Sequence, residues 1–335
     1  MKKFTNFLKK EATIGLVAPS FGANIEPYKT RLTYALKLFK KMGYKIKTFG
    51  DLYGYQEGAS ETKEKRAKHF MACYLDSEVD VIFSVSGGEL LMEILPLLDF
   101  EIINAAPVKL FCGYSDNTNL TFVLTTMLNI PTVYGPTFTN FGMKPLDPFL
   151  KRTLQILSGN FIKQNSSSYY EPRDYQNTDP LASYNLTLKT KWRNLNEEKE
   201  IRLEGILIGG CLDVLIGLVG TQYDDVKNFL KQHQKEKIIW YLESFDLNSL
   251  KFKRALWQLK EAGWFERIDG LLIGRHLNEE AALGITHDDV LKELFNIPVI
   301  VDLDIGHVKP MLTIINGYKA LIVNNENESY YQILK

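Results

Sequence analysis

The sequence is poor in cysteine and has no excess of charge of either sign. Its 335 residues include three cysteines, Cys73, Cys112 and Cys211, whose spacing fits neither a disulfide framework nor a Cys-x-x-Cys zinc site. Lysine and arginine together number 40, and aspartate and glutamate also number 40, so no basic field is present to gather phosphates. We therefore expect no metal and no nucleic-acid partner, and a ligand that is a small molecule or a peptide.

Long hydrophobic runs are also absent. The longest uncharged stretch, residues 117–143, is rich in threonine and asparagine, and the apolar stretch 205–220 is shorter than a membrane span. Met1–Lys10 is basic, but the apolar run that follows, Ile14–Ala18, is too short for the hydrophobic region of a signal peptide. We expect no membrane segment, no export signal and a cytoplasmic location.

The length and composition favour two soluble globular domains. A chain of 335 residues exceeds the roughly 250 residues at which single hydrophobic cores stop growing. Hydrophobic residues make up 45% of the chain and charged residues 24%. This is the balance of a folded protein, and it excludes a disordered or low-complexity chain.

The first half of the chain alternates short apolar runs with amphipathic ones. The periodicity predicts strands at 13–18, 44–49, 79–85 and 108–112, and helices at 28–42, 59–75 and 120–128. This alternation is typical of crossover units on a parallel sheet, so we expect an α/β fold there.

The composition changes between residues 159 and 200, where polar residues and proline replace the apolar periodicity. This pattern is typical of a linker or surface loop. The second half resumes with strands predicted at 203–208, 238–242, 270–273, 299–301 and 320–323, and helices at 211–218, 223–232, 250–262 and 288–294.

The most informative local segment is Val108–Thr118, an apolar strand that passes through a tight turn into a helix. It resembles a nucleophile elbow in which Gly113 permits the turn and Ser115 stands at its top. The backbone amide of Asp116 is then the natural oxyanion donor. Asn117 stands where the usual Gly-x-Ser-x-Gly pattern has its second glycine, and a plain N-cap role for Ser115 is the alternative interpretation.

A second glycine turn follows the strand predicted at 79–85. Strand ends on one edge of a parallel sheet converge at the ligand crevice, so Gly87 and Gly88 can bring a backbone amide close to a substrate oxygen. A Rossmann phosphate loop is excluded, because the Gly-x-Gly-x-x-Gly pattern is absent.

A serine nucleophile needs a base and a carboxylate that orients the base. Among five histidines, His307 lies in an irregular loop after an apolar strand, which is where scaffolds present functional side chains. A loop histidine without a role is the alternative. Glu243 ends the strand predicted at 238–242 and either serves a site or caps the next helix, for which Asp246 is the more ordinary candidate.

A series of segments, in order over nearly the whole chain, matches one known family. These segments are Gly15–Ser20, Ser86–Gly88 with Glu93–Asp99, Gly113–Asp116, Tyr134–Pro136, Glu204–Gly210, Tyr241–Glu243, Arg254–Leu259, Gly270–Gly274 and Gly306–His307. Together they resemble the LD-carboxypeptidase family of serine peptidases, which includes the muramoyl-tetrapeptide carboxypeptidases and the microcin C resistance (MccF-like) peptidases.

The resemblance implies a catalytic triad of Ser115, Glu243 and His307. It implies an oxyanion hole made by the backbone amides of Gly88 and Asp116. The expected enzyme is a serine carboxypeptidase without metal or organic cofactor. Its expected substrate is either a murein-derived tetrapeptide or a microcin C-like peptidyl or aminoacyl nucleotide, and its expected assembly is a homodimer.

The resemblance also implies a division into domains. Residues 1–165 would form a parallel-sheet α/β domain that carries the serine, and 166–200 a linker and surface loop. Residues 201–335 would form a smaller, mixed α/β domain that carries the glutamate and histidine, with the active site in the cleft between the domains.

Three further residues are candidates for substrate contacts, namely Gly87, Trp192 and Cys211. Cys211 stands where the family usually has asparagine, which leaves the substrate preference open. Trp192 either stacks on a nucleobase or anchors the core of the second domain. A binding protein without catalysis is the alternative function, and an amidotransferase that uses Cys112 is disfavoured because this residue lies inside a predicted strand.

Overall fold

The structure is a computed structural model that describes residues 1–4, 6–175 and 178–334. The chain divides into two compact units. The described residues of Met1–Asn160 and Gln176–Tyr184 form the N-terminal unit, and those of Phe161–Tyr175 and Asn185–Lys335 form the C-terminal unit. The stretch 166–200, which the sequence assigns to a linker, therefore belongs in part to each unit.

The N-terminal unit is built around a parallel sheet with the strand order β5-β4-β3-β1-β2. Its strands are β1 (Thr13–Val17), β2 (Lys45–Phe49), β3 (Val81–Ser84), β4 (Leu110–Gly113) and β5 (Thr132–Tyr134). Its helices are α1 (Tyr28–Lys41), α2 (Lys63–Leu75), α3 (Phe100–Ala105), α4 (Thr118–Leu128) and α5 (Pro148–Leu157), with 3-10 turns η1 (Leu91–Leu97), η2 (Ser115–Asn117) and η3 (Phe138–Phe141).

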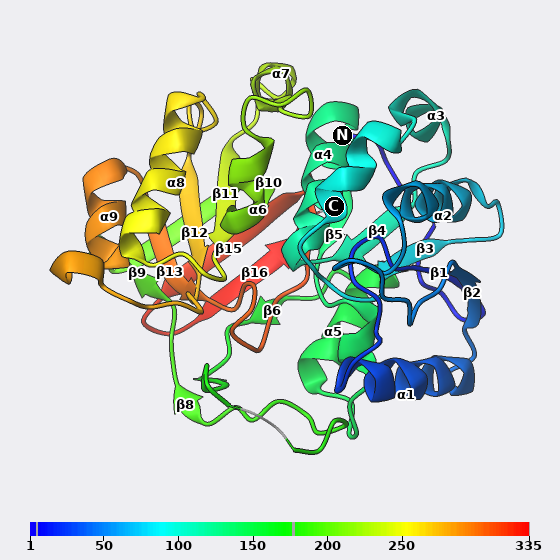
Figure 1. The fold of residues 1–335 in the computed structure, drawn as a ribbon. Coiled ribbons are helices and arrows are strands. Elements are labelled where there is room, and N and C mark those ends of the chain that lie inside the picture. The colour runs from blue at the N-terminus through cyan, green and yellow to red at the C-terminus, as the bar shows by residue number, and fades with distance from the viewer. Residues whose placement is uncertain (5, 176–177, 335) are drawn as a thin grey trace. The chain divides into compact units, whose positions relative to one another are not determined.

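Helices cover both faces of this sheet. Figure 1 shows α1 and α5 on one face and α2, α3 and α4 on the other. The strands β1 and β3 are buried along their whole length, as expected for parallel strands covered on both sides. The predicted parallel α/β fold is thus confirmed for the first half of the chain.

Local capping sets where the predicted helices begin. The sequence predicts a helix from residue 59, but α2 begins at Lys63 because the side chain of Thr62 accepts a hydrogen bond from the amide of Lys65 and caps the helix there. The preceding Ser60 instead donates its hydroxyl to the carbonyl oxygen of Ala18, which ties this loop to the end of β1.

The C-terminal unit contains a mixed sheet with the strand order β6-β16-β15-β10-β11-β12-β13-β9. Its strands are β6 (Gln164–Asn165), β7 (Tyr169–Tyr170), β8 (Leu188–Lys189), β9 (Arg193–Asn194), β10 (Glu200–Cys211), β11 (Ile238–Glu243), β12 (Gly270–Gly274), β13 (Val299–Leu303), β14 (Ile314–Asn316), β15 (Lys319–Asn325) and β16 (Ser329–Ile333). Its helices are α6 (Leu212–Leu218), α7 (Val226–Gln232), α8 (Ser249–Glu261) and α9 (His287–Leu294), with a 3-10 turn η4 (Ala282–Gly284).

The middle of this sheet is parallel and its flanks are antiparallel. Strands β10 to β13 run parallel, whereas β15 and β9 pair antiparallel with β10 and β13. The parallel strands therefore bring their carboxyl ends to one edge of the sheet. Inside this unit Trp240 stacks on Trp264, with ring centroids 5.8 Å apart.

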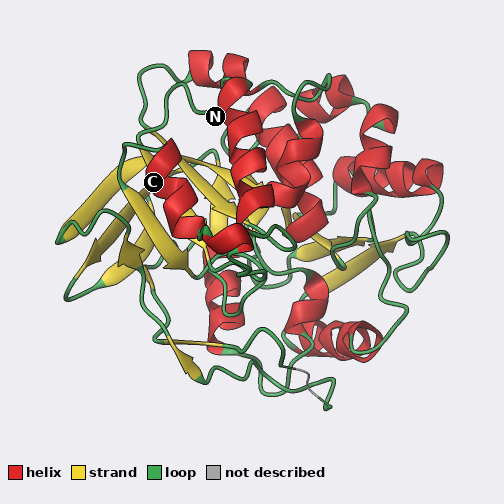
Figure 2. Cartoon of the chain, turned by 60° about the vertical axis from the view of Figure 1, so that its left-hand side comes forward, coloured by secondary structure: helices red, strands yellow, loops and turns green. Residues whose placement is uncertain are grey.

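The segment predicted as a linker contains short strands. β7 and β8 form a two-stranded antiparallel ribbon within an otherwise loop-rich stretch (Figure 2), and β9 extends the main sheet of the C-terminal unit. Periodicity did not reveal these strands because each has two residues. In the part of the chain that the structure describes, no helix is both long and apolar enough to cross a membrane.

Candidate active site

Ser115 lies directly after β4, in the turn that leads into α4. Its backbone has φ +63°, a left-handed conformation that residues with side chains rarely adopt, and it is partly exposed. Tyr114 and Asn117 occupy the N-cap positions of η2 and α4, so Ser115 caps neither helix. A serine in a strained turn between a strand and a helix has the backbone geometry of a nucleophile elbow.

Asn117 explains why this turn departs from the usual Gly-x-Ser-x-Gly pattern. Its side-chain amide donates to the carbonyl oxygens of Tyr114 at 2.9 Å and Ser86 at 3.0 Å, and so ties the serine turn to the loop after β3. The side chain also lies against Gly113, where an added Cβ would be 2.7 Å from Asn117 Cγ. Gly113 is therefore needed to leave room for the asparagine that clamps the turn.

The loop after β3 brings two glycines to the serine turn. A Cβ on Gly87 would lie 3.2 Å from the Cβ of Ser115 and 3.3 Å from its Oγ. Gly88 has φ +152°, and a Cβ there would collide with the hydroxyl of Ser20 in the loop after β1. The loops after β1, β3 and β4 thus converge, as expected at the switch point of a doubly wound sheet.

The buried carboxylate of Asp116 holds these loops together. It accepts hydrogen bonds from the Ser20 hydroxyl, from the backbone amide of Leu91 at 2.9 Å and from the side-chain amide of Asn119 at 2.9 Å. Burial raises the pKa of Asp116, whereas these hydrogen bonds act in the opposite direction. The side chain of Asp116 thus positions the turn, a role separate from the oxyanion contact predicted for its backbone amide.

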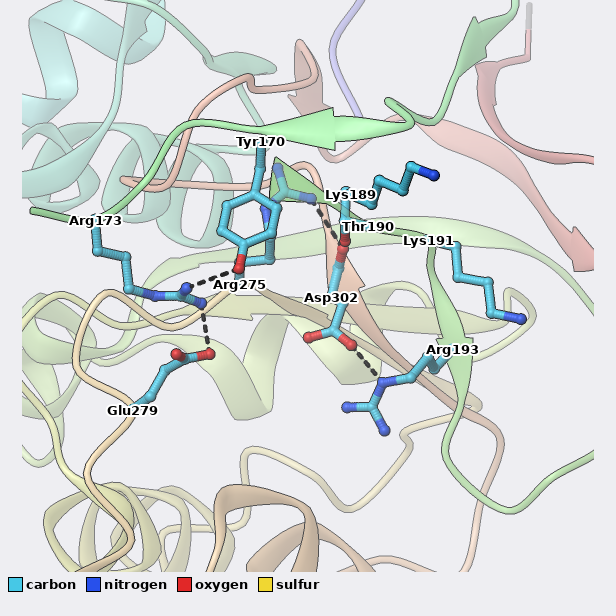
Figure 3. A pocket seen from close by; sticks show the side chains of 9 residues that line it. All are labelled: Tyr170, Arg173, Lys189, Thr190, Lys191, Arg193, Arg275, Glu279 and Asp302. Carbon is cyan, nitrogen blue, oxygen red and sulfur yellow. Dashed lines mark hydrogen bonds and ion pairs between the residues drawn. The ribbon is translucent and has the colours of Figure 1, made fainter. Parts of the chain in front are cut away.

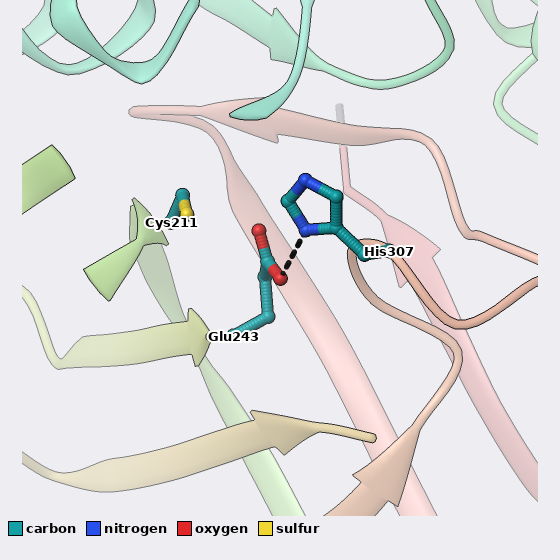
Figure 4. A group of neighbouring side chains, drawn as sticks. All are labelled: Cys211, Glu243 and His307. Atoms are coloured by element: carbon teal, nitrogen blue, oxygen red, sulfur yellow. Dashed lines mark hydrogen bonds and ion pairs between the residues drawn. The ribbon is translucent and has the colours of Figure 1, made fainter. Parts of the chain in front are cut away.

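In the C-terminal unit, Glu243 and His307 form a hydrogen-bonded pair. Glu243 is the last residue of β11 and is fully buried, and His307 lies in the loop after β13. Nδ1 of His307 is 2.8 Å from Oε2 of Glu243. The other ring nitrogen, Nε2, points away from the carboxylate (Figure 4). The geometry is that of an imidazole oriented by a buried carboxylate.

Two glycines create the space that the Glu243 side chain occupies. Gly306 has φ +91°, and a Cβ there would collide with the carboxyl group of Glu243. On the neighbouring strand, a Cβ on Gly274 would lie 3.0 Å from the Cβ of Glu243. On the other side, the ring of Phe245 lies 4.8 Å from that of His307, measured between centroids. The pair is thus held by close packing as well as by its hydrogen bond.

Cys211 lies beside this pair. It ends β10 and is in register with Glu243 on β11, and it is buried. Cys211, Glu243 and His307 each offer one donor atom within 4.8 Å of the others. Burial and the nearby Glu243 carboxylate raise the pKa of the Cys211 thiol well above its usual value. Cys211 is therefore a protonated thiol next to the predicted catalytic pair.

Trp192 lies in the interior of the C-terminal unit. Its side chain is 3% exposed, and its indole N–H donates to Oδ2 of Asp304 at 3.1 Å. A nucleobase needs an open aromatic face to stack on, so this position favours the interpretation of Trp192 as a core anchor.

The structure also disfavours two other interpretations. Cys112 is buried inside β4, and burial raises the pKa of its thiol, which argues against an amidotransferase nucleophile. Asp246 is not the N-cap of α8, because Asn248 holds that position and accepts a hydrogen bond from the amide of Lys251. Neither of the two capping candidates, Asp246 and Glu243, therefore caps this helix.

A separate pocket of about 570 Å³ lies near the carboxyl ends of β12 and β13 (Figure 3). It is lined by Tyr170, Arg173, Lys189, Thr190, Lys191, Arg193, Arg275, Glu279 and Asp302. Its arginines are bound to carboxylates, as in the pairs Arg173–Glu279, Arg193–Asp302 and Arg275–Asp304. Among the described residues, the ammonium groups of Lys189 and Lys191 have no such partner. The lining therefore carries a net positive charge, with five cationic and two acidic side chains.

Two family models match this chain. The LD-carboxypeptidase N-terminal domain matches residues 14–135, and the LD-carboxypeptidase C-terminal domain matches residues 204–322. The chain belongs to the LD-carboxypeptidase family. The first matched region contains Ser115 and the second contains Glu243 and His307, so the LD-carboxypeptidase match includes all three predicted triad residues.

Similar proteins include both branches that the sequence resembles. Microcin C7 self-immunity protein MccF of Escherichia coli is 27% identical over 95% of this chain and 92% of its own length. Murein tetrapeptide carboxypeptidase of Pseudomonas aeruginosa is 25% identical over 66% of this chain and 63% of its own length. A solved structure of an MccF mutant in complex with adenosine monophosphate has a TM-score of 0.84 at 24% identity, and covers 100% of this chain and 99% of that one. The predicted family and fold class are confirmed.

The sequence did not predict the residues that hold the Ser115 turn in place through the carboxylate of Asp116. Ser20, Leu91 and Asn119 all bind the Asp116 carboxylate, but nothing in their local sequence marks this role. Ser20 gave a partial signal, because it closes one of the matching family segments and follows the first strand. Strand ends on one sheet edge converge, so polar residues at each strand end were the available clue.

Proposed function

We propose that this chain is a serine carboxypeptidase in which Ser115 is the nucleophile, His307 the base and Glu243 the carboxylate that orients the base. The hydrogen bond between His307 Nδ1 and the buried Glu243 carries the proposal. A carboxylate that accepts from Nδ1 keeps the proton on that nitrogen, which leaves the lone pair of Nε2 to accept a serine proton. The left-handed turn at Ser115 supports the nucleophile assignment.

In the proposed acylation step, Ser115 Oγ attacks the carbonyl carbon of the terminal amide and its proton passes to His307 Nε2. The negative oxygen of the tetrahedral intermediate accepts hydrogen bonds from the backbone amides of Gly88 and Asp116. The C–N bond then breaks, and His307 gives its proton to the leaving amine. Water, deprotonated by His307, hydrolyses the acyl-enzyme and restores the Ser115 hydroxyl.

The proposal requires the two units to meet in the active enzyme. Ser115 belongs to the N-terminal unit, whereas Glu243 and His307 belong to the C-terminal unit. Activation of the serine needs His307 Nε2 within about 3 Å of Ser115 Oγ. We propose that this contact forms across a cleft in which the substrate binds.

The relatives support two classes of substrate. One is a murein-derived tetrapeptide, after the name of the Pseudomonas aeruginosa relative. The other is a peptidyl or aminoacyl nucleotide of the microcin C type, because a 27% identical relative is a microcin C7 self-immunity protein. MccF has also been solved in complex with aspartyl sulfamoyl adenosine. We propose a small amide of one of these classes as the substrate and a homodimer as the assembly, which light scattering tests.

Fluorophosphonate labelling of the full chain tests the nucleophile, because the reagent reacts with an activated serine. We expect one adduct, located on Ser115 by peptide mass analysis. Ser115→Ala should abolish it, whereas Ser158→Ala, an exposed serine at the end of α5, should label normally. A folded protein that forms no adduct would favour the binding-protein alternative.

Product analysis then separates the substrate classes. The protein is incubated with a murein tetrapeptide and, in parallel, with an aspartyl sulfamoyl nucleoside, and the products are identified by mass. Loss of the terminal residue from the tetrapeptide assigns the first class, and release of aspartate assigns the second. Labelling of Ser115 without turnover of either compound would exclude both substrate classes while keeping the serine hydrolase assignment.

A further inference from the structure

The group formed by Cys211, Glu243 and His307 has the composition of a metal site. Its donor atoms, one thiol sulfur, one carboxylate oxygen and one imidazole nitrogen, all lie within 4.8 Å of one another. They come from the adjacent strand ends of β10 and β11 and from the loop after β13, all in the C-terminal unit. Figure 4 shows the carboxylate between the thiol and the imidazole.

The distances are close to those of tetrahedral zinc. Zinc binds sulfur at about 2.3 Å and nitrogen or oxygen at about 2.0 to 2.2 Å, so neighbouring donors lie roughly 3.3 to 3.6 Å apart. His307 Nδ1 and Glu243 Oε2 are 2.8 Å apart and the widest separation in the group is within 4.8 Å. Movements of the three donor atoms by roughly 1 Å would therefore place them at three ligand positions of a tetrahedral zinc ion, and the fourth position would be open to water.

The charge balance also suits zinc. A zinc ion with one thiolate, one carboxylate and one neutral imidazole has no net charge, and a neutral cluster avoids the cost of burying a charge. Cys211 and Glu243 are buried, and the His307 side chain is 11% exposed. A soft thiolate with an imidazole selects zinc over magnesium or calcium, which prefer oxygen ligands.

Binding would displace one proton and move another. The Cys211 thiol loses its proton to solvent when its sulfur binds the metal, because a coordinated thiol is deprotonated. The metal takes the place of the proton on His307 Nδ1, and the neutral ring then carries its proton on Nε2. An Nε2 that bears a proton cannot accept one from a serine hydroxyl.

We infer that Cys211, Glu243 and His307 form a zinc-binding site and that zinc bound there inhibits the hydrolase. The binding part stands on the geometry of the C-terminal unit alone, whereas the inhibition part rests on the proposed function. The asparagine that the family usually has at this position offers no thiolate, so zinc sensitivity would be a property of chains that carry cysteine here.

Cobalt spectroscopy on the full-length, chelator-treated protein tests the binding. A thiolate bound to Co²⁺ gives a charge-transfer band in the near ultraviolet, and tetrahedral Co²⁺ gives visible bands. We expect both bands to saturate at one Co²⁺ per chain and to disappear when Zn²⁺ is added. Absence of the charge-transfer band in the wild-type protein would overturn the site.

Variants test whether the sulfur that binds the metal belongs to Cys211. Cys211→Ser should lose the charge-transfer band. It should also bind Zn²⁺ more weakly, because a ligand itself is lost. Loss of a residue that only supports a ligand lowers metal affinity roughly 10- to 100-fold, and the loss in Cys211→Ser should be larger. Cys211→Asn provides a second variant if the serine form does not fold. Cys73→Ala is the matched control, since Cys73 is also buried but lies on α2 in the N-terminal unit. An unchanged band in a folded Cys211 variant, or its loss in Cys73→Ala, would overturn the assignment.

Fluorophosphonate labelling of Ser115 tests the inhibition. Zn²⁺ should slow labelling of the wild-type protein, and Mg²⁺ at the same concentration should not. The Zn²⁺ concentration that halves the labelling rate should be at least tenfold higher for Cys211→Ser than for the wild-type protein, with each rate compared to that of the same protein without zinc. Equal zinc sensitivity in the two proteins would refute the inhibitory site. If cobalt binding depends on Cys211 but Ser115 never labels, the metal site stands and the proposed function fails.

Discussion

The two units carry their candidate catalytic residues at equivalent places, the ends of parallel strands, but they hold them by different means. In the N-terminal unit the backbone positions Ser115, through a left-handed turn that Asn117 fastens to the loop after β3. In the C-terminal unit a buried side chain positions another side chain, because Glu243 fills space left open by Gly306 and binds His307.

Because of this difference, we expect substitutions at Ser115 to affect mainly the rate, and substitutions around Glu243 to affect both the rate and the stability of the fold. The Ser115 side chain is partly exposed, so removal of its hydroxyl should alter chemistry more than packing. Glu243 is fully buried, so changes around it affect packing as well as the orientation of His307.

Ser115→Ala should lower the rate of hydrolysis by a factor on the order of 10⁶, because no other group replaces the nucleophile. The free energy of unfolding should change by no more than about 0.5 kcal/mol, since a partly exposed hydroxyl contributes little packing. Single-turnover kinetics and urea unfolding measure the two quantities. A variant that keeps more than a tenth of the wild-type rate would exclude Ser115 as the nucleophile.

Glu243→Gln should lower the rate by a factor on the order of 10⁴, because an amide in place of the carboxylate no longer enforces the correct imidazole tautomer.

His307→Ala should lower the rate about as much as Ser115→Ala does. The double variant of Ser115 and His307 should be no slower than either single variant, because the two residues act as one unit. Glu279→Gln, which removes an exposed ion pair with Arg173, is the control and should change the rate little. If the rate loss of the Ser115 and His307 double variant equals the product of the two single losses, the two residues do not act in the same step.

Gly306→Ala should destabilise the protein more than Gly220→Ala does. Both glycines have positive φ, so both substitutions cost about 1 to 2 kcal/mol of backbone strain. The new methyl group at 306 also collides with the Glu243 carboxyl group, which adds about 1 to 3 kcal/mol, whereas nothing lies within 4 Å of the methyl group at 220. Urea unfolding measures the difference, and equal losses would mean that Glu243 is not tightly packed.

The C-terminal unit should lose stability in mild acid. His276 and His287 stack with their ring centroids 4.0 Å apart. Burial lowers the pKa of both histidines, and the proximity of His287 and Arg173 lowers that of His276 further. As the pH falls below about 6.5, the unfolded chain binds protons that the folded chain does not, so each histidine removes up to about 1.4 kcal/mol of stability per pH unit.

His276→Asn tests this effect, because asparagine can keep a hydrogen bond to Ser244 but does not titrate. The unfolding free energy of the variant should depend less steeply on pH between about 6.5 and 5 than that of the wild type. A comparison at pH 8, where the histidines are neutral in both states, isolates the packing cost of the substitution. Identical slopes would show that His276 binds its proton equally well in the folded and the unfolded chain.

Much of the fold was predictable because it is encoded in contiguous residues. The apolar run and the helical spacing of Leu32, Ala35 and Phe39 gave β1 and α1 almost to the residue. Strand β16 and helix α5 were missed, and so were the two-residue strands between 164 and 194. Two residues cannot establish a periodicity, and such strands form because a neighbouring strand offers its backbone groups.

The sequence by itself determined the family, the positions along the chain of most strands and helices, and the residue types at the strand ends, including Ser115, Glu243 and His307. Turn residues and apolar periodicity act over a few positions, so they can be recognised in one sequence. Tertiary structure alone decided which side chains meet. Cys211 faces Glu243 through the register of two strands, and Glu243 fits because Gly306, 63 positions further along the chain, leaves it room. Such contacts depend on how strands align and pack, and no local pattern specifies that alignment.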